Sequence, residues 1–212
     1  MFLPLHFKTK QLSCLIVGGG HVAAHKVEIL TSAGCPLTVV APAIDSHIRH
    51  AVERSQVRWH ARAFEAGDCA GFQLVIAATP HRAVNRTVSE EARNLGIPVN
   101  VVDDPELCTV FFGAIWQDGP LTVSVSSGGT APFMARALRD GIARAHAGMG
   151  AWVDAAAHFR AAVRNEVTDV EERGRLYRRF ADEAKSGPPG SLPQSTHLTD
   201  WLNWLERRTS DQ

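Results

Sequence analysis

The chain has 212 residues, of which 45% are hydrophobic and 21% charged, a balance typical of a globular protein that buries a core. Lysine plus arginine and aspartate plus glutamate both number 22, so the basic excess of a nucleic-acid-binding protein is missing. The four cysteines are isolated and form no CxxC pair, which favours reduced thiols and a cytoplasmic location. The apolar run Leu12–Val17 is too short to span a bilayer. We therefore expect no nucleic-acid and no membrane partner.

The first hundred residues alternate between short apolar runs and stretches with helical spacing of apolar residues. The runs predict strands at Leu12–Val17, Leu37–Val40, Gln56–His60, Leu74–Ala78 and Pro98–Val102. The stretches between them predict helices at Val22–Ser32, Ile44–Arg54 and Arg82–Asn94. Most of the strands lack polar alternation, as expected when both faces of a sheet are covered. This order predicts a parallel, doubly wound α/β sheet.

The pattern changes after Asp104. Apolar runs at Thr109–Trp116 and Leu121–Ser126 flank the turn-forming segment QDGP at 117–120, which predicts a hairpin or two neighbouring strands. The segment SSGGT at 126–130 follows, and a helix is expected from Pro132 to about His146.

The last third of the chain is expected to be helical. Helices are predicted at Ala151–Asn165 and Val170–Lys185, and SGPPGSLPQS at 186–195 predicts a mobile linker. The amphipathic end around Trp201 and Trp204 predicts either a docking helix or a helix that only ends the chain.

A glycine loop follows the first predicted strand. Gly18, Gly20 and Ala23 fit the pattern GxGxxA at the point where a strand ends and a helix begins. Gly18 would permit the tight turn, Gly20 would leave room for a pyrophosphate at the helix N-terminus, and Ala23 would let the helix approach the sheet. The alternative is a glycine-rich turn without a ligand.

The acidic residue that usually binds the adenosine ribose is missing from the end of the second strand. That strand ends VAPA at 40–43, and Asp45 comes two residues later. Either backbone groups or Asp45 would therefore hold the ribose. No arginine or lysine lies beside Ala41 to pair with a 2′-phosphate, so NAD is favoured over NADP.

Four motifs, the first of which contains the glycine loop, together resemble those of a known family. LIVGGGHVAAHK, LVIAATPHRAVN, VNVVDDPELC and LTVSVSSGGTAPFMARALR resemble the precorrin-2 dehydrogenase/sirohydrochlorin ferrochelatase family, the module that precedes a methyltransferase in fused siroheme synthases. The likeness runs from about Leu3 to Phe180. No methyltransferase domain follows in this sequence, so the resemblance is to the stand-alone form.

The resemblance implies an enzyme that oxidises precorrin-2 to sirohydrochlorin with NAD, and that in some members inserts ferrous iron at the same site. It implies an NAD-binding Rossmann domain over residues 1–112, a dimerisation region over 113–147 and a helical C-terminal domain over 148–212. It also implies a homodimer. Any iron would be a substrate, and no resident metal site is expected.

The family's catalytic carboxylate corresponds to Asp103, the first aspartate of NVVDDP. The residue follows the last Rossmann strand at its carboxyl end, where ligands bind in such sheets. Oxidation of a reduced tetrapyrrole removes a hydride and a proton, and a carboxylate can accept that proton. The alternative for Asp103 is a turn cap before Pro105; Asp104 shares this alternative more strongly.

Further contacts follow from the same resemblance. Substrate-binding residues would be Asn100, Ser127 and Gly128, with hydrogen bonding of a loop as the alternative for Asn100 and helix capping as the alternative for Ser126 and Thr130. The SSGGT segment presents backbone N–H groups suited to the substrate's carboxylates. The dinucleotide contacts would be His21, Val22, Pro42, Ala43 and Thr79.

Two positions depart from the family pattern. Pro80 and His81 replace a common acidic pair after Thr79, and Gly113 replaces a proline before Ala114. His81 is either a second acid/base or metal contact, or an ordinary residue at a helix start. These differences bear on the chelatase activity and the exact substrate and leave dehydrogenation intact. The competing functions are a non-catalytic NAD-binding sensor and a Rossmann dehydrogenase for another small molecule.

Overall fold

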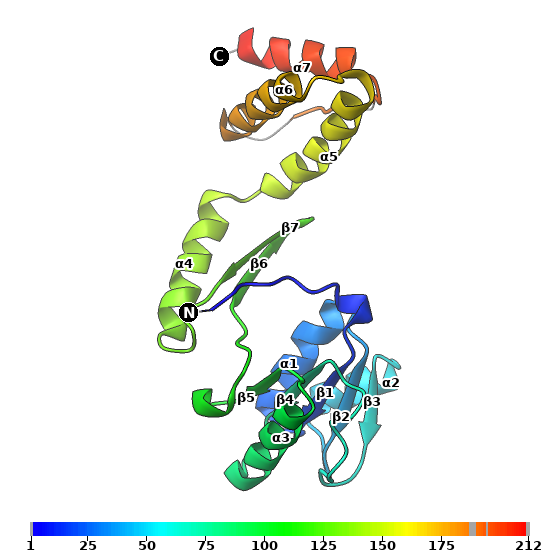
Figure 1. Ribbon diagram of the computed structural model, residues 1–212, viewed down its shortest axis with the longest axis vertical. Coiled ribbons are helices and arrows are strands. Elements are labelled where there is room, and N and C mark those ends of the chain that lie inside the picture. Colours follow the sequence, from blue (N-terminus) through cyan, green and yellow to red (C-terminus); the bar gives the residue numbers. More distant parts are fainter. Residues whose placement is uncertain (1, 187–189, 194, 211–212) are drawn as a thin grey trace. The chain divides into compact units, whose positions relative to one another are not determined.

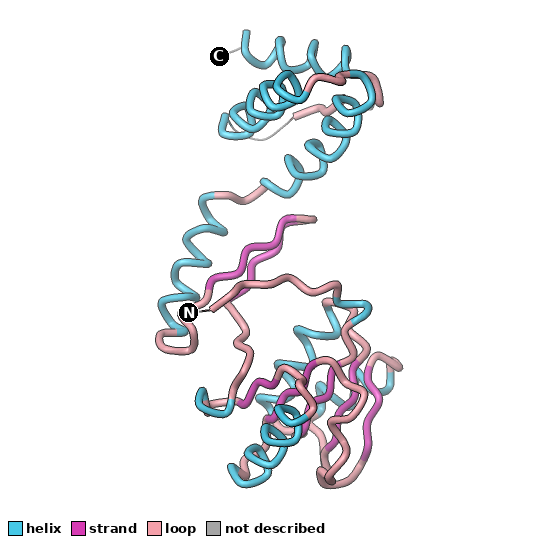
Figure 2. Tube along the Cα trace, in the orientation of Figure 1, coloured by secondary structure: helices cyan, strands magenta, loops and turns pink. Residues whose placement is uncertain are grey.

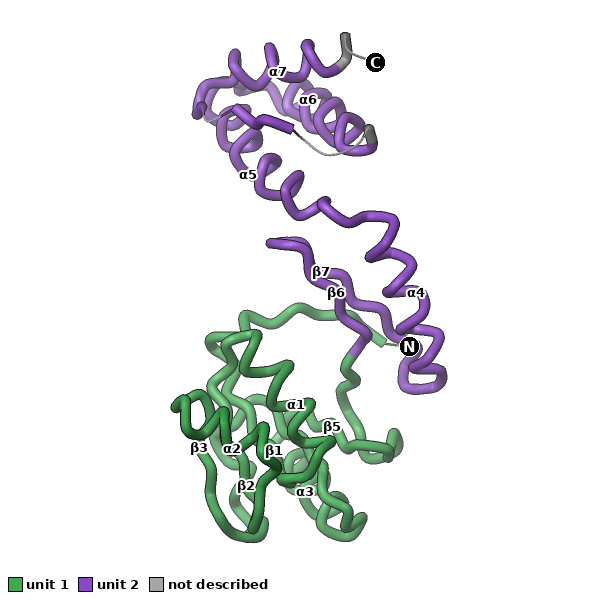
Figure 3. The backbone as a smooth tube through the Cα atoms, turned by 180° about the vertical axis from the view of Figure 1, so that it is seen from behind, with its two compact units in different colours: residues 1–112 green, residues 113–212 purple. Residues whose placement is uncertain are grey.

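The computed structural model describes residues 2–186, 190–193 and 195–210. The chain forms two compact units, residues 1–112 and 113–212 (Figure 3). This boundary coincides with the end of the expected Rossmann domain. The further division at residue 148 stays a prediction.

The first unit contains a five-stranded sheet in the order β3-β2-β1-β4-β5, and every neighbouring pair is parallel (Figure 1). Its strands are β1 (Cys14–Val17), β2 (Leu37–Val40), β3 (Val57–His60), β4 (Leu74–Ala77) and β5 (Val99–Val101). The chain moves outward from β1 to β3 and then returns to β4 beside β1. The predicted doubly wound parallel sheet is therefore confirmed.

Helices cover both faces of this sheet (Figure 1). On one face, α1 (His21–Ser32) and α2 (Ser46–Glu53) bury apolar side chains against β1 and β2. On the other face, α3 (Arg82–Asn94) packs against β4 and β5. All four side chains of β1 and of β4 are buried, which explains why these strands show no polar alternation.

Several predicted boundaries differ from the structure, and two of them do so for identifiable reasons. The helix expected from Ile44 begins at Ser46 because the Asp45 carboxylate accepts a hydrogen bond from the His47 backbone N–H at 2.9 Å and caps the helix. The strand expected from Thr109 begins only at Ala114. The backbone N–H groups of residues 109 and 110 both donate to the Val99 carbonyl, so the segment crosses beside β5 instead of continuing as a ladder.

The second unit begins with an antiparallel hairpin of β6 (Ala114–Asp118) and β7 (Leu121–Val125), as predicted. Gly119 takes a positive φ of 54° in its two-residue turn. Helix α4 (Pro132–Ala145) packs against both strands.

Only helices follow α4 in the described part of the chain (Figure 2). They are α5 (Met149–Glu166), α6 (Val170–Glu183), the short turn η3 (Ala184–Ser186) and α7 (Leu198–Ser210). Their core is rich in aromatic rings, and Trp201 on α7 is fully buried in it. Helix α7 therefore packs on α5 and α6 as part of this helical core, which agrees with the docking helix among the two alternatives from the sequence. The predicted mobile linker at 186–195 lies partly outside the described residues.

Within the residues that the structure describes, no helix combines the length and the apolar character needed to cross a membrane.

Candidate dinucleotide and substrate site

Two of the three consecutive glycines are required by the fold itself. Gly18 has a φ of 122°, and its backbone N–H donates to the Val40 carbonyl at 3.0 Å. A Cβ atom at Gly18 would collide with the carbonyl of Ala78, and one at Gly19 would collide with the carbonyl of Ala43. These glycines let the loop after β1 lie directly between the loops that follow β2 and β4.

Gly20 differs from its two neighbours. It has an ordinary φ of −82°, and a Cβ atom built on it would meet no atom within 4 Å. Nothing in the folded chain requires glycine here, but a side chain would fill the space in front of α1. An unfilled cradle at this position fits a pyrophosphate that approaches the backbone closely.

The N-terminus of α1 provides donors for such a ligand. No side chain caps the helix, and the first helical hydrogen bond runs from the Ala24 N–H to the Gly20 carbonyl at 2.9 Å. The backbone N–H groups of His21, Val22 and Ala23 precede that bond and carry the positive end of the helix dipole. The side chains of His21 and Val22 are exposed, whereas Ala23 is fully buried against the sheet.

The loop after β2 is fixed beside the glycines. The Trp59 indole N–H donates to the Ala41 carbonyl at 2.9 Å, and the Asp45 backbone N–H donates to the Gly19 carbonyl at 2.7 Å. Pro42 and Ala43 are exposed on this loop. Pro42 and Ala43, the expected contacts to the adenosine, thus lie at the same edge of the sheet as the glycine loop.

Asp45 has a defined partner near this edge. Its carboxylate accepts hydrogen bonds from the backbone N–H of His47 and lies 2.9 Å from the His47 ring Nδ1. These contacts lower the pKa of Asp45, chiefly through the backbone N–H. A negative charge is therefore held next to the loop at 41–43.

Thr79 is held by a residue that the sequence analysis missed. The Asn85 side-chain oxygen accepts from the Thr79 N–H at 3.2 Å and from its hydroxyl at 2.7 Å, and the Asn85 NH₂ donates to the Thr79 carbonyl at 2.9 Å. Asn85 is only 6% exposed. The sequence marks Asn85 only as a polar residue three positions before the apolar Val88 on α3.

Asp103 lies directly after β5, at the carboxyl end of the sheet. Its backbone takes a φ of 59°, and Ser55 is the other non-glycine residue with a positive φ in the described part of the chain. Its side chain is exposed, and among the described residues no hydrogen bond or ion pair engages its carboxylate. Strained backbone at a non-glycine residue is typical of functional positions.

Asp104 has a different environment. Its side chain is 13% exposed and accepts a hydrogen bond from the Arg82 guanidinium at 2.8 Å. Asp104 raises the pKa of Arg82 further. The two adjacent aspartates thus have different roles. Asp104 links α3 to the loop after β5, whereas the Asp103 carboxylate has no partner among the described residues.

Asn100 is on β5 and is buried. Its side-chain NH₂ donates to the Val110 carbonyl at 3.0 Å, which supports the segment that crosses beside β5. This is the loop-stabilising role that the sequence left open as an alternative, and contact with a substrate stays a prediction.

Ser127 and Gly128 belong to the second unit, in the loop before α4. The Ser127 hydroxyl accepts from the Ala131 N–H at 3.0 Å, and its carbonyl accepts from the Thr130 hydroxyl at 2.6 Å. Gly128 and Gly129 both have positive φ values, 63° and 84°. Neither Ser126 nor Thr130 caps α4, because the N-cap residue is Ala131.

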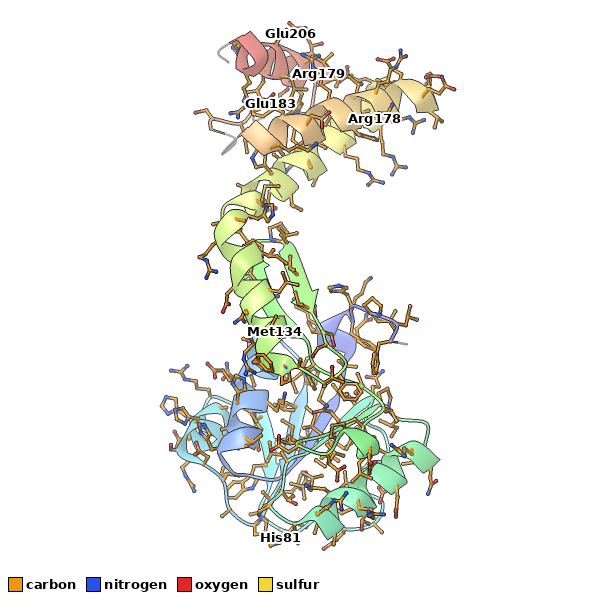
Figure 4. All side chains as sticks on the ribbon, turned by 90° about the vertical axis from the view of Figure 1, so that its left-hand side faces the viewer. His81, Met134, Arg178, Arg179, Glu183 and Glu206 are labelled. Carbon is orange, nitrogen blue, oxygen red and sulfur yellow. The ribbon has the colours of Figure 1, made fainter. Side chains whose placement is uncertain are left out.

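His81 is exposed on the loop that precedes α3, and its side chain does not cap that helix (Figure 4). Across the described ranges, no group of three or more histidine, cysteine, aspartate or glutamate side chains is arranged to hold a metal ion.

The parallel sheet, the unfilled cradle at Gly20 and the free helix N-terminus define a dinucleotide-binding protein of the Rossmann type. Residues 5–114 match the family described as putative NAD(P)-binding, and residues 118–145 match the sirohaem biosynthesis protein central family. The chain therefore belongs to the putative NAD(P)-binding family, and the resemblance drawn from its motifs is confirmed.

Relatives and a solved structure agree with this placement. The chain is 41% identical over 192 residues to a siroheme synthase of Methylococcus capsulatus, covering 90% of this chain and 40% of that protein. It is 42% identical over 208 residues to a siroheme synthase of Azotobacter vinelandii, covering 98% and 44%. The chain thus spans less than half the length of each. The structure of SirC, precorrin-2 dehydrogenase, shares the fold with a TM-score of 0.75 at 18% identity, covering 99% of this chain and 100% of that one.

Proposed function

We propose that the protein oxidises precorrin-2 to sirohydrochlorin with NAD as the acceptor. One observation carries this proposal: an unfilled dinucleotide cradle and an uncommitted carboxylate, Asp103, both follow parallel strands at the carboxyl edge of one sheet. Ligands of doubly wound sheets bind at this edge. The name siroheme synthase, carried by relatives at 41% and 42% identity, supports a tetrapyrrole substrate.

The cofactor would be held by the backbone N–H groups of residues 21–23, by the loop at Pro42 and Ala43, and by Thr79 on the nicotinamide side. When bound, NAD supplies an acceptor for the hydride that leaves the substrate. The carboxylate of Asp45 stays ionised because its pKa is lowered by His47. A fixed negative charge beside the ribose end disfavours a 2′-phosphate, which supports NAD over NADP.

Asp103 would act as the base. Oxidation of precorrin-2 removes one hydride and one proton, so the products are sirohydrochlorin, the reduced cofactor and a proton. The exposed Asp103 carboxylate would accept that proton and pass it to solvent. Asp103 has a left-handed backbone, and Arg82 binds the carboxylate of the neighbouring Asp104.

Ferrous iron insertion is the second activity that we propose for this site. Chelation displaces two protons from pyrrole nitrogens, and the exposed Asp103 carboxylate is suited to accept them. In this scheme iron is a substrate. Ser127 and Gly128 would contribute contacts to substrate carboxylates through the loop before α4.

The second unit supports a homodimer. The apolar side chains of Phe133, Met134 and Leu138 on α4 are 63%, 58% and 58% exposed. Met134 is labelled on α4 in Figure 4. Large apolar side chains clustered on one exposed helix are typical of a protein interface. We assign residues 113–147 to dimerisation through this face and residues 148–212 to a helical domain. The four free cysteines support function in the reducing cytoplasm.

The test is an anaerobic incubation of the purified protein with precorrin-2 and NAD, followed by visible spectroscopy before and after ferrous iron is added. We expect sirohydrochlorin to form only when NAD is present, and siroheme to form faster with protein than without it. Tight NAD binding without any tetrapyrrole turnover would favour the non-catalytic sensor. Oxidation of another small molecule would favour a different Rossmann dehydrogenase.

A further inference from the structure

The turn that carries Asp103 contains a cysteine that the proposed reaction does not use. The short helical turn η2 (Pro105–Leu107) brings the chain back so that Cys108 lies against the end of β5. Its sulfur accepts from the Val101 N–H at 3.1 Å and lies 3.2 Å from the Val101 carbonyl oxygen and 3.4 Å from the Asp104 carbonyl oxygen. One side chain therefore contacts the backbone on both sides of Asp103.

The outer side of this turn is attached to α3 by other groups. Arg82 binds the Asp104 carboxylate, Ser89 donates to the Leu107 carbonyl at 2.7 Å, and Arg93 donates to the Glu106 carbonyl at 2.8 Å. None of these contacts reaches the strand end at Val101. The sulfur of Cys108 is the side-chain contact that joins that strand end to the far side of the turn among the described residues.

Asp103 needs such a constraint because its backbone is in a left-handed conformation, with φ at 59°. Aspartate adopts this conformation more readily than most residues other than glycine, but it still costs free energy, and surrounding contacts hold it in place. Burial raises the pKa of the Cys108 thiol, so the thiol keeps its proton at neutral pH and can donate to a carbonyl. A raised thiol pKa also argues against a nucleophilic role.

We infer that Cys108 is a positioning residue that holds the backbone of Asp103 in its left-handed turn, and thereby places the carboxylate that serves as the base. This inference rests on the proposed function of Asp103. Removal of the Cys108 side chain would leave the attachment of η2 to α3 intact. The loss would therefore change the placement of Asp103 more than the stability of the fold.

The test compares Cys108→Ala, Cys108→Ser, Asp103→Ala and the double variant with both alanines in the anaerobic precorrin-2 assay under single-turnover conditions. Misplacement of a reacting group by about 1 Å can cost on the order of 100-fold in rate. We expect Cys108→Ala to slow turnover ten- to a hundredfold with an unchanged KM for NAD, and Cys108→Ser, whose hydroxyl also donates and accepts, to recover part of the rate. The control is Cys69→Ala, which removes a fully buried thiol whose hydrogen bonding is to α3, and which should keep the wild-type rate.

The double variant decides the mechanism. If Cys108 acts through Asp103, adding Cys108→Ala to Asp103→Ala leaves the residual rate unchanged. A further drop of tenfold or more in that background would overturn the inference, as would wild-type turnover of Cys108→Ala while Asp103→Ala is inactive; both results would leave the proposed function intact. Wild-type turnover of Asp103→Ala would instead refute the proposed base. If Cys108→Ala does not fold, the same cycle is run with Cys108→Ser.

Discussion

Substitution of Gly20 by alanine tests whether the space in front of α1 is a cofactor cradle. The added methyl group would meet no protein atom within 4 Å, and the backbone φ of −82° is open to any residue. Reduced freedom of the unfolded chain would stabilise the variant by about 0.4–1 kcal/mol, whereas alanine is a poorer N-cap than glycine by a similar amount. We therefore expect the unfolding free energy to change by less than about 1 kcal/mol.

Binding of NAD should respond very differently. A methyl group at Gly20 would keep a pyrophosphate from the backbone N–H groups of residues 21–23. Loss of one or two charge-assisted hydrogen bonds, at about 1.5 kcal/mol each, corresponds to a roughly 10- to 100-fold weaker Kd. Titration calorimetry with NAD and thermal unfolding without ligand measure the two effects on the same sample.

Gly18→Ala is the matched control. Its methyl group would collide with the Ala78 carbonyl, and its φ of 122° is unfavourable for alanine, so this variant should lose stability even without ligand. Wild-type NAD affinity in Gly20→Ala would refute the cradle. A loss of stability in Gly20→Ala as large as in Gly18→Ala would show that the glycine serves the fold alone.

Three further variants test other parts of the account. Asn85→Ala should lower the unfolding free energy by about 1–3 kcal/mol, because it removes the hydrogen bonds that Asn85 makes to the part-buried backbone N–H and carbonyl of Thr79, and should raise the KM for NAD. Asp68→Asn should lower the urea midpoint at pH 7, and the difference from the wild type should shrink as the pH falls below 3.8. Arg62 lowers the pKa of Asp68 below 3.8, so this stabilisation is complete above that pH and is lost as the pH falls through the folded-state pKa. A difference that does not shrink at any pH below 3.8 would contradict that reasoning. Leu138→Glu should convert a dimer to a monomer in light scattering, and a dimer that persists would exclude this face.

The sequence predicts the sheet well because its information is local. Strands such as Leu74–Ala77 are fully apolar and short, and each is followed by a turn and a helix, so the pattern defines both the elements and their parallel order. The glycine loop was also recognisable because its residues are adjacent. The start of the strand predicted from Thr109 was wrong because the Thr109 N–H donates to the carbonyl of Val99 at the start of β5, ten residues away, and composition does not reveal that partner.

The site is harder to predict from the sequence, because contacts between distant segments decide the roles of its residues. GGG does not reveal that Gly18 and Gly19 are required by neighbouring loops while Gly20 is not, because those neighbours come from residues 43 and 78. Likewise, DDP does not separate Asp103 from Asp104, since the difference arises from Arg82 and from a left-handed backbone. Pairings between distant segments decide which of two identical residues remains available for chemistry.

The central claim is that Asp103 is the base of an NAD-dependent tetrapyrrole oxidation. The most direct measurement is the anaerobic rate of sirohydrochlorin formation by Asp103→Ala, with NAD affinity measured in parallel and Asp104→Ala as the adjacent control. We expect Asp103→Ala to lose at least about 100-fold in rate, in the range typical of a general base, with an unchanged NAD affinity. Asp104→Ala should retain more activity. Wild-type turnover by Asp103→Ala would contradict the account.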